Sequence, residues 1–86
     1  MTLEWTRVYH GDWEATSRVK DDGSTYWWGI VALGTGLFSI KNSRAGLCLL
    51  VPEGLYQHKF STLADAQAVC QAAEDEAVKL KAAGLL

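Results

Sequence analysis

The chain has 86 residues, of which 49% are hydrophobic and 21% charged, and its formal net charge is −2. This length gives room for a single domain spanning residues 1–86, and the composition argues against disorder, a polybasic membrane surface and a general attraction to phosphate backbones. No apolar run approaches the roughly 20 residues of a membrane span, and no N-terminal signal segment is recognisable, so we expect a cytoplasmic protein.

Two segments with alternating polarity open the chain. Residues 3–10 and 13–20 both alternate as strands do, and Gly11-Asp12 between them supplies turn chemistry. The second segment has one polar face, which is typical of a strand near a sheet edge. A strong turn signal at residues 21–24 follows, so the chain is expected to enter an antiparallel meander.

The central segment, residues 25–33 (TYWWGIVAL), has no polar face. Its alternating side chains form two apolar sets, Tyr26, Trp28, Ile30 and Ala32 on one side and Trp27, Gly29, Val31 and Leu33 on the other. One helix is wide enough to cover only about two neighbouring strands of a sheet. One apolar face therefore stays open, which predicts a curled sheet, a homo-oligomer or a partner; we favour self-association as a dimer.

Three further strands are expected before the helix. Residues 37–40, 47–51 and 55–60 are short apolar or mixed runs, separated by a polar loop from Lys41 to Arg44 and by a turn at Pro52. The region from about residue 3 to residue 60 is thus predicted to form five or six strands of an antiparallel, curled sheet.

A C-terminal helix is predicted over residues 62–82. Thr62 is a suitable N-cap, Asp65 favours the positive end of the helix, and Gly84 is a suitable stop. One apolar stripe follows at spacings of three and four: Leu63, Ala66, Cys70, Ala73, Ala77 and Leu80. We expect this stripe to pack on the sheet, with a helix–helix dimer seam as the alternative. The acidic run 74–76 is interpreted as a solvated face, with a basic partner as the alternative. The predicted fold class is α+β.

No catalytic signature emerges. Residues 10–14 place a histidine near two carboxylates, but exposed polar groups are common at hairpins. His58 with Cys48 and Cys70 lacks the four closely spaced ligands that zinc needs. We therefore predict no enzyme, no metal and no cofactor. Two free buried thiols are favoured over a disulfide between Cys48 and Cys70.

Binding is the function that the composition favours. The predicted interface residues are Trp27, Val31 and Leu33, and the predicted partner is another protein, a second copy of the chain, or both. The alternative is a small nucleic-acid-binding module that uses sheet aromatics with Lys41 and Arg44. Residues 1–62 hold six Lys/Arg and six Asp/Glu, so this alternative lacks a basic stripe.

Residues 60–67 (FSTLADAQ), which follow a Trp-rich β-meander, resemble the strand-to-helix junction of small uncharacterised phage and prophage proteins. In those proteins a strand ending in Phe leads into a Thr-Leu-x-x-Ala helix that closes the chain. The resemblance implies an accessory or host-directed role, as in binders that block bacterial defence machinery, anti-CRISPR proteins among them. It assigns no functional residue, and residues 47–51 do not match it.

Overall fold

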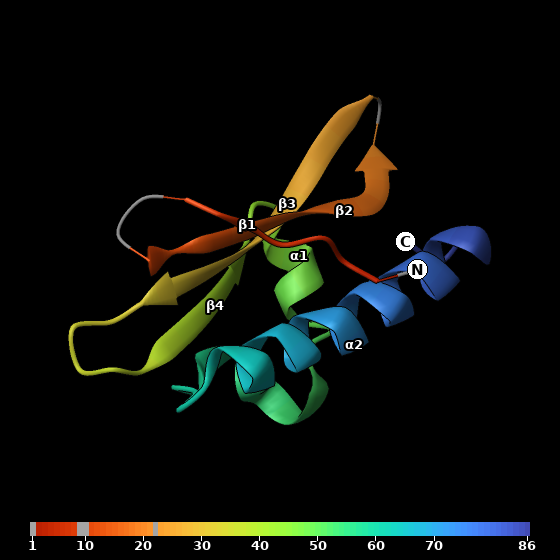
Figure 1. Ribbon diagram of the computed structural model, residues 1–86. Coiled ribbons are helices and arrows are strands. Elements are labelled where there is room, and N and C mark those ends of the chain that lie inside the picture. Colours follow the sequence, from red (N-terminus) through yellow and green to blue (C-terminus); the bar gives the residue numbers. More distant parts are fainter. Residues whose placement is uncertain (1, 9–10, 22) are drawn as a thin grey trace.

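The computed structural model describes residues 2–8, 11–21 and 23–86. Within them, one antiparallel sheet contains four strands in chain order: β1 (Thr6–Arg7), β2 (Trp13–Asp21), β3 (Ser24–Ala32) and β4 (Phe38–Asn42). Three helical segments follow: α1 (Ala45–Cys48), the 3-10 helix η2 (Pro52–Gln57) and the long helix α2 (Leu63–Ala82). All three lie on the same side of the sheet (Figure 1). The predicted α+β class is confirmed.

The C-terminal helix is confirmed with its cap. Thr62 has an extended backbone, and its side-chain oxygen accepts a hydrogen bond from the Asp65 amide at 3.1 Å. Helix α2 then runs for 20 residues to Ala82 and has lysines in its last turn.

The predicted number of strands is wrong for the described residues. Residues 47–51 hold the end of α1 and a turn, and residues 55–60 hold η2 and a single bridge between Phe60 and Phe38. The buried members of the first run, Leu47 and Val51, are four residues apart, whereas Leu49 between them is 77% exposed. This spacing is helical, and short apolar runs do not separate the two structures by composition.

Two further expectations about the sheet need correction. The predicted first strand, residues 3–10, pairs only at Thr6 and Arg7, opposite Glu14 and Trp13 of β2, and its last two residues lie outside the described ones. The predicted curling is not confirmed, because the four strands form one open sheet. A single layer of helical segments covers one face of this sheet, and the other face is left without them (Figure 1).

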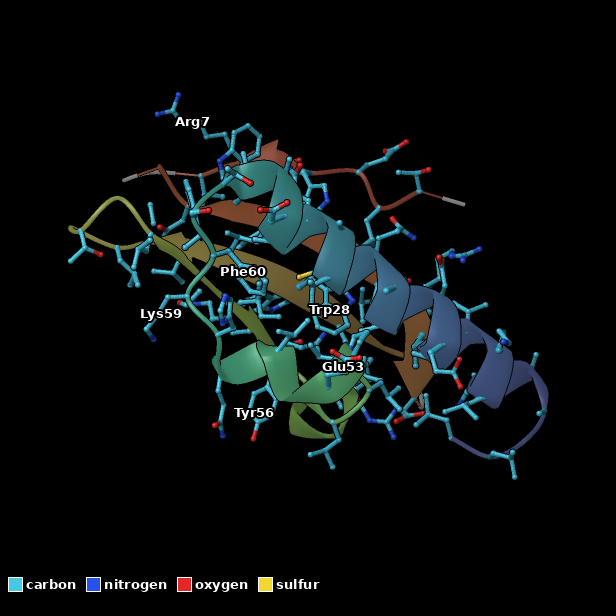
Figure 2. All side chains as sticks on the ribbon, turned by 90° about the horizontal axis from the view of Figure 1, so that it is seen from below. Arg7, Trp28, Glu53, Tyr56, Lys59 and Phe60 are labelled. Atoms are coloured by element: carbon cyan, nitrogen blue, oxygen red, sulfur yellow. The ribbon has the colours of Figure 1, made fainter. Side chains whose placement is uncertain are left out.

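The core lies between the sheet and α2. Trp28 and Ile30 of β3 are fully buried, as are the alanines and Cys70 along the helix stripe. Small side chains on α2 let the helix come close to the sheet, and the large ring of Trp28 fills the space beneath it (Figure 2).

A buried carboxylate joins α2 to the sheet. Glu74 is 0% exposed, and its Oε1 accepts hydrogen bonds from Ser17 Oγ at 2.6 Å and from Trp28 Nε1 at 3.2 Å. Its Oε2 accepts one from the Arg18 backbone amide at 2.7 Å. The Ser17 hydroxyl, which donates to Glu74, also accepts from the Val19 amide at 3.0 Å. Three donors thus satisfy a charge that would otherwise be very unfavourable in the core.

An irregularity in β2 presents two of these donors, Ser17 Oγ and the Arg18 amide. Thr16 pairs with Trp27 and Lys20 pairs with Thr25, so three residues of β2 stand opposite one residue of β3. Extra residues in one strand turn its backbone groups away from the ladder. Here the amide of Arg18 turns toward the helix and meets Glu74.

The interpretation of residues 74–76 as a solvated face is wrong for Glu74. Asp75 and Glu76 are exposed, whereas Glu74 lies four residues after Cys70 and three before Ala77, which puts it on the buried stripe. The spacing of Glu74 from Cys70 and Ala77 predicts a buried position, but a charged side chain is normally expected on a solvated face.

Glu74→Ala should destabilise the fold by about 3–5 kcal/mol, because it leaves two buried donors, Ser17 Oγ and Trp28 Nε1, and the part-buried Arg18 amide without an acceptor. The matched control is Glu76→Ala, which removes only an exposed carboxylate 3.7 Å from Lys79 and should change the free energy of unfolding by less than about 1 kcal/mol. Urea denaturation of both variants measures the difference. Equal stabilities would show that the buried contacts contribute nothing net.

Candidate functional site

The face of the sheet away from α2, called here the open face, is set by the strand register. Glu14, Gly29 and Lys41 are cross-strand neighbours on β2, β3 and β4, so their side-chain positions share one face. The same face carries Thr6, Thr16, Trp27, Val31 and Ser39. Trp28 and Ile30, which alternate with these positions on β3, point into the core instead.

Trp27 and Lys41 form a ridge over Gly29 on the open face. Lys41 Nζ lies 5.3 Å from the centroid of the Trp27 ring, a cation–π distance. A Cβ atom at Gly29 would lie 2.9 Å from Lys41 Cε and 3.0 Å from Trp27 Cζ3. Both side chains therefore lean across Gly29, which is buried beneath them, and a larger residue would push them away.

A hollow lies beside this ridge, toward β1 and β2. It has a volume of about 210 Å³. Its lining residues are Glu4, Thr6, Glu14, Ala15, Thr16 and Trp27. Two of these side chains are carboxylates and the ridge carries an ammonium group, so the open face has a positive ridge next to an acidic hollow.

The predicted interface residues lie in two different places, on β3 and just after its end. Trp27 and Val31 lie on the open face and are half-buried. Leu33 follows the end of β3, where its amide donates to the Leu37 carbonyl at 2.8 Å, and it is also half-buried. Their role as an interface stays a prediction.

Lys41 and Arg44, the predicted nucleic-acid-binding pair, have different surroundings. Lys41 belongs to the ridge, whereas Arg44 Nη1 is 3.0 Å from Asp21 Oδ2 and its guanidinium lies 5.5 Å from the centroid of the Tyr26 ring. Arg44 thus ties the β4–α1 connection to the β2–β3 hairpin and is already engaged within the fold.

Asp21 is the centre of this second cluster. Lys81 near the end of α2 donates to its Oδ1 at 2.9 Å, and this hydrogen bond holds the pKa of Asp21 below its usual value, with the charge of Arg44 acting in the same direction. The cluster joins the hairpin tip to the helix C-terminus.

The two cysteines are free thiols. Cys48 on α1 is half-buried, and Cys70 on α2 is fully buried. Burial raises the pKa of Cys70 to about 12, with a smaller contribution from Cys48, so at neutral pH this thiol is protonated and unreactive.

The described part of the chain contains no cluster of three or more His, Cys, Asp or Glu side chains that suits a metal ion. His10, the histidine of the 10–14 segment, lies outside the described residues. Asp12 accepts a hydrogen bond from the Ala32 amide at 3.0 Å and so closes the end of the β2–β3 pair.

Comparisons of the chain with protein-family models, with curated proteins and with solved structures find no match. None of the helices in the described residues has the length and apolar character needed to cross a membrane.

The contact between Trp27 and Lys41 is not predictable from the sequence, because it depends on the pairing of Gly29 with Lys41 across the β3–β4 hairpin. The turn residues Gly34-Thr35-Gly36 give the approximate position of this hairpin, and only the register shows which side chains meet.

Asp21→Asn should destabilise the protein at pH 7, and the loss should disappear in acid. The folded-state pKa of Asp21 lies below its usual value of 3.8, so its stabilising contribution is complete above that value and is lost as the pH falls through the folded-state pKa. Unfolding free energies of both proteins, measured between about pH 7 and pH 2, should therefore converge at low pH. Glu76→Gln serves as the control carboxylate, and a difference for Asp21→Asn that persists at the lowest pH would contradict the argument.

Proposed function

We propose that the chain is a small non-catalytic protein-binding module that receives its partner on the open face. The observation that carries this proposal is the Trp27–Lys41 ridge on a sheet face that lies opposite all the helical segments (Figure 1). Tryptophan is among the residues that dominate binding energy in protein interfaces, above all where a pocket or a charge partner surrounds it.

The charges near the ridge favour a protein over a nucleic acid. Glu4 and Glu14 line the hollow beside Trp27, and a phosphate backbone lying along the ridge would meet both carboxylates. Arg44, the second cation that the nucleic-acid alternative needs, is paired with Asp21. Nucleic-acid binding through Lys41 and Arg44 is therefore the second candidate.

The biological setting is part of the proposal. The resemblance of residues 60–67 to phage and prophage proteins supports a role as a phage-encoded accessory protein, such as an inhibitor of host defence. The two free thiols are compatible with action in a reducing cytoplasm.

Trp27→Ala should reduce partner capture by at least about 10-fold, because a central aromatic anchor typically contributes about 2 kcal/mol or more. The tagged chain is expressed together with an untagged copy in its native host, and the lysate, with and without nuclease treatment, is analysed by pull-down and mass spectrometry. We expect a stoichiometric protein, either the untagged copy or another chain, to be retained by the wild type and lost from the variant.

Tyr56→Ala is the matched control for this experiment. Tyr56 is also a half-buried aromatic residue, but it lies on η2, on the helical side of the sheet (Figure 2). Capture should survive this change. Equal capture by wild type and Trp27→Ala would refute the proposal, and capture that vanishes with nuclease would favour the nucleic-acid alternative.

A further inference from the structure

We infer that the partner on the open face is a second copy of this chain, packed face to face about a two-fold axis that runs parallel to β3. The inference rests on the proposed protein-binding role of the open face and names its occupant. Two properties of that face support this arrangement: the order of its charges and the position of its acidic hollow.

The first property is a line of charges across the sheet. Glu14 and Lys41 flank Gly29 on opposite sides of β3. Because neighbouring strands are about 4.8 Å apart, the two charged positions are about 10 Å apart across the sheet. Both side chains are exposed. Each is therefore accessible to a partner.

A two-fold axis along β3 exchanges the two sides of that strand. Lys41 of one copy then faces Glu14 of the other, and the same pair forms a second time on the other side of the axis. An axis in the same plane but perpendicular to β3 would instead place Glu14 against Glu14 and Lys41 against Lys41. Like charges at such an interface oppose association, so the charge order selects the first axis.

The second property is the position of the ridge and of the acidic hollow on the open face. The ridge of Trp27 and Lys41 leans over Gly29, and the acidic hollow lies on the side of β1 and β2. The same rotation about β3 brings Lys41 of one copy above the β2 side of the other, where Glu4 and Glu14 line the hollow. Trp27, which lies on β3, stays near the axis and faces Trp27 of the other copy. The positive end of the ridge thus meets the acidic hollow in this arrangement.

The area of the open face sets the expected affinity of the dimer. The four strands hold 2, 9, 9 and 5 residues, so at about 3.3 Å per residue and about 4.8 Å between strands the face measures roughly 400 Å² per copy, or about 800 Å² in total. This is below the roughly 1,200 Å² at which standard specific interfaces begin. The dimer should therefore be weak and reversible, with a dissociation constant between about 10 μM and 1 mM.

The inference is tested by exchanging the two charges. Glu14→Lys and Lys41→Glu should each weaken the homodimer by at least about 10-fold, because each creates two like-charge contacts. An equimolar mixture of the two variants should associate again, since each new lysine would face a new glutamate. Sedimentation velocity up to about 1 mM and native mass spectrometry measure the homodimers and the mixed dimer.

Lys59→Glu is the matched charge-reversal control. Lys59 is exposed and lies between η2 and α2, on the helical side of the sheet (Figure 2). This variant should dimerise like the wild type. Thermal unfolding of every variant separates a lost interface from a lost fold, and recovery on mixing would itself show that both single variants are folded.

Three results would overturn the inference: a wild type that stays monomeric up to about 1 mM, a dimer that neither reversal weakens, or variants that fail to associate when mixed. The failure of the broader proposal would look different. If the wild type is monomeric but captures another protein through Trp27, the open face is a protein-binding surface and only its assignment to a second copy is wrong.

Discussion

The hydrogen bonds of Glu74 set the relation between the helix and the sheet. A carboxylate buried in the core is tolerated only where donors surround it, and here the donors come from β2 and β3. A shift of α2 by one turn would leave both the charge and its donors unpaired. The network therefore fixes which part of the helix lies over which strand, in addition to any contribution that it makes to stability.

The same network decides which face of the sheet stays open. The indole of Trp28 donates to Glu74, so Trp28 must point toward α2. Because adjacent residues of a strand point to opposite faces, Trp27 must point away from it. The arrangement of Trp27, Gly29 and Lys41 on the open face is thus a consequence of a contact on the opposite side of the sheet.

The parts of the fold that were predictable from sequence are those with long, consistent patterns. The alternation of residues 13–20 and the stripe and cap of residues 62–82 define β2 and α2 correctly. The pattern of residues 47–51 predicts a strand, whereas these residues hold the end of α1 and a turn, because five apolar residues fit either structure. The open face was predictable only as an excess of apolar side chains: its ridge requires the β3–β4 register, which depends on tertiary pairing.

Gly29 gives a reason to connect the open face with function. A glycine inside a strand destabilises it by roughly 0.5–1 kcal/mol relative to alanine. Gly29 faces away from the core, so the packing of α2 does not require it, and the atoms nearest to a Cβ atom there would belong to Lys41 and Trp27. The glycine is therefore explained by the ridge that it accommodates. That ridge is not needed to close the core, and this supports the binding role proposed for the open face.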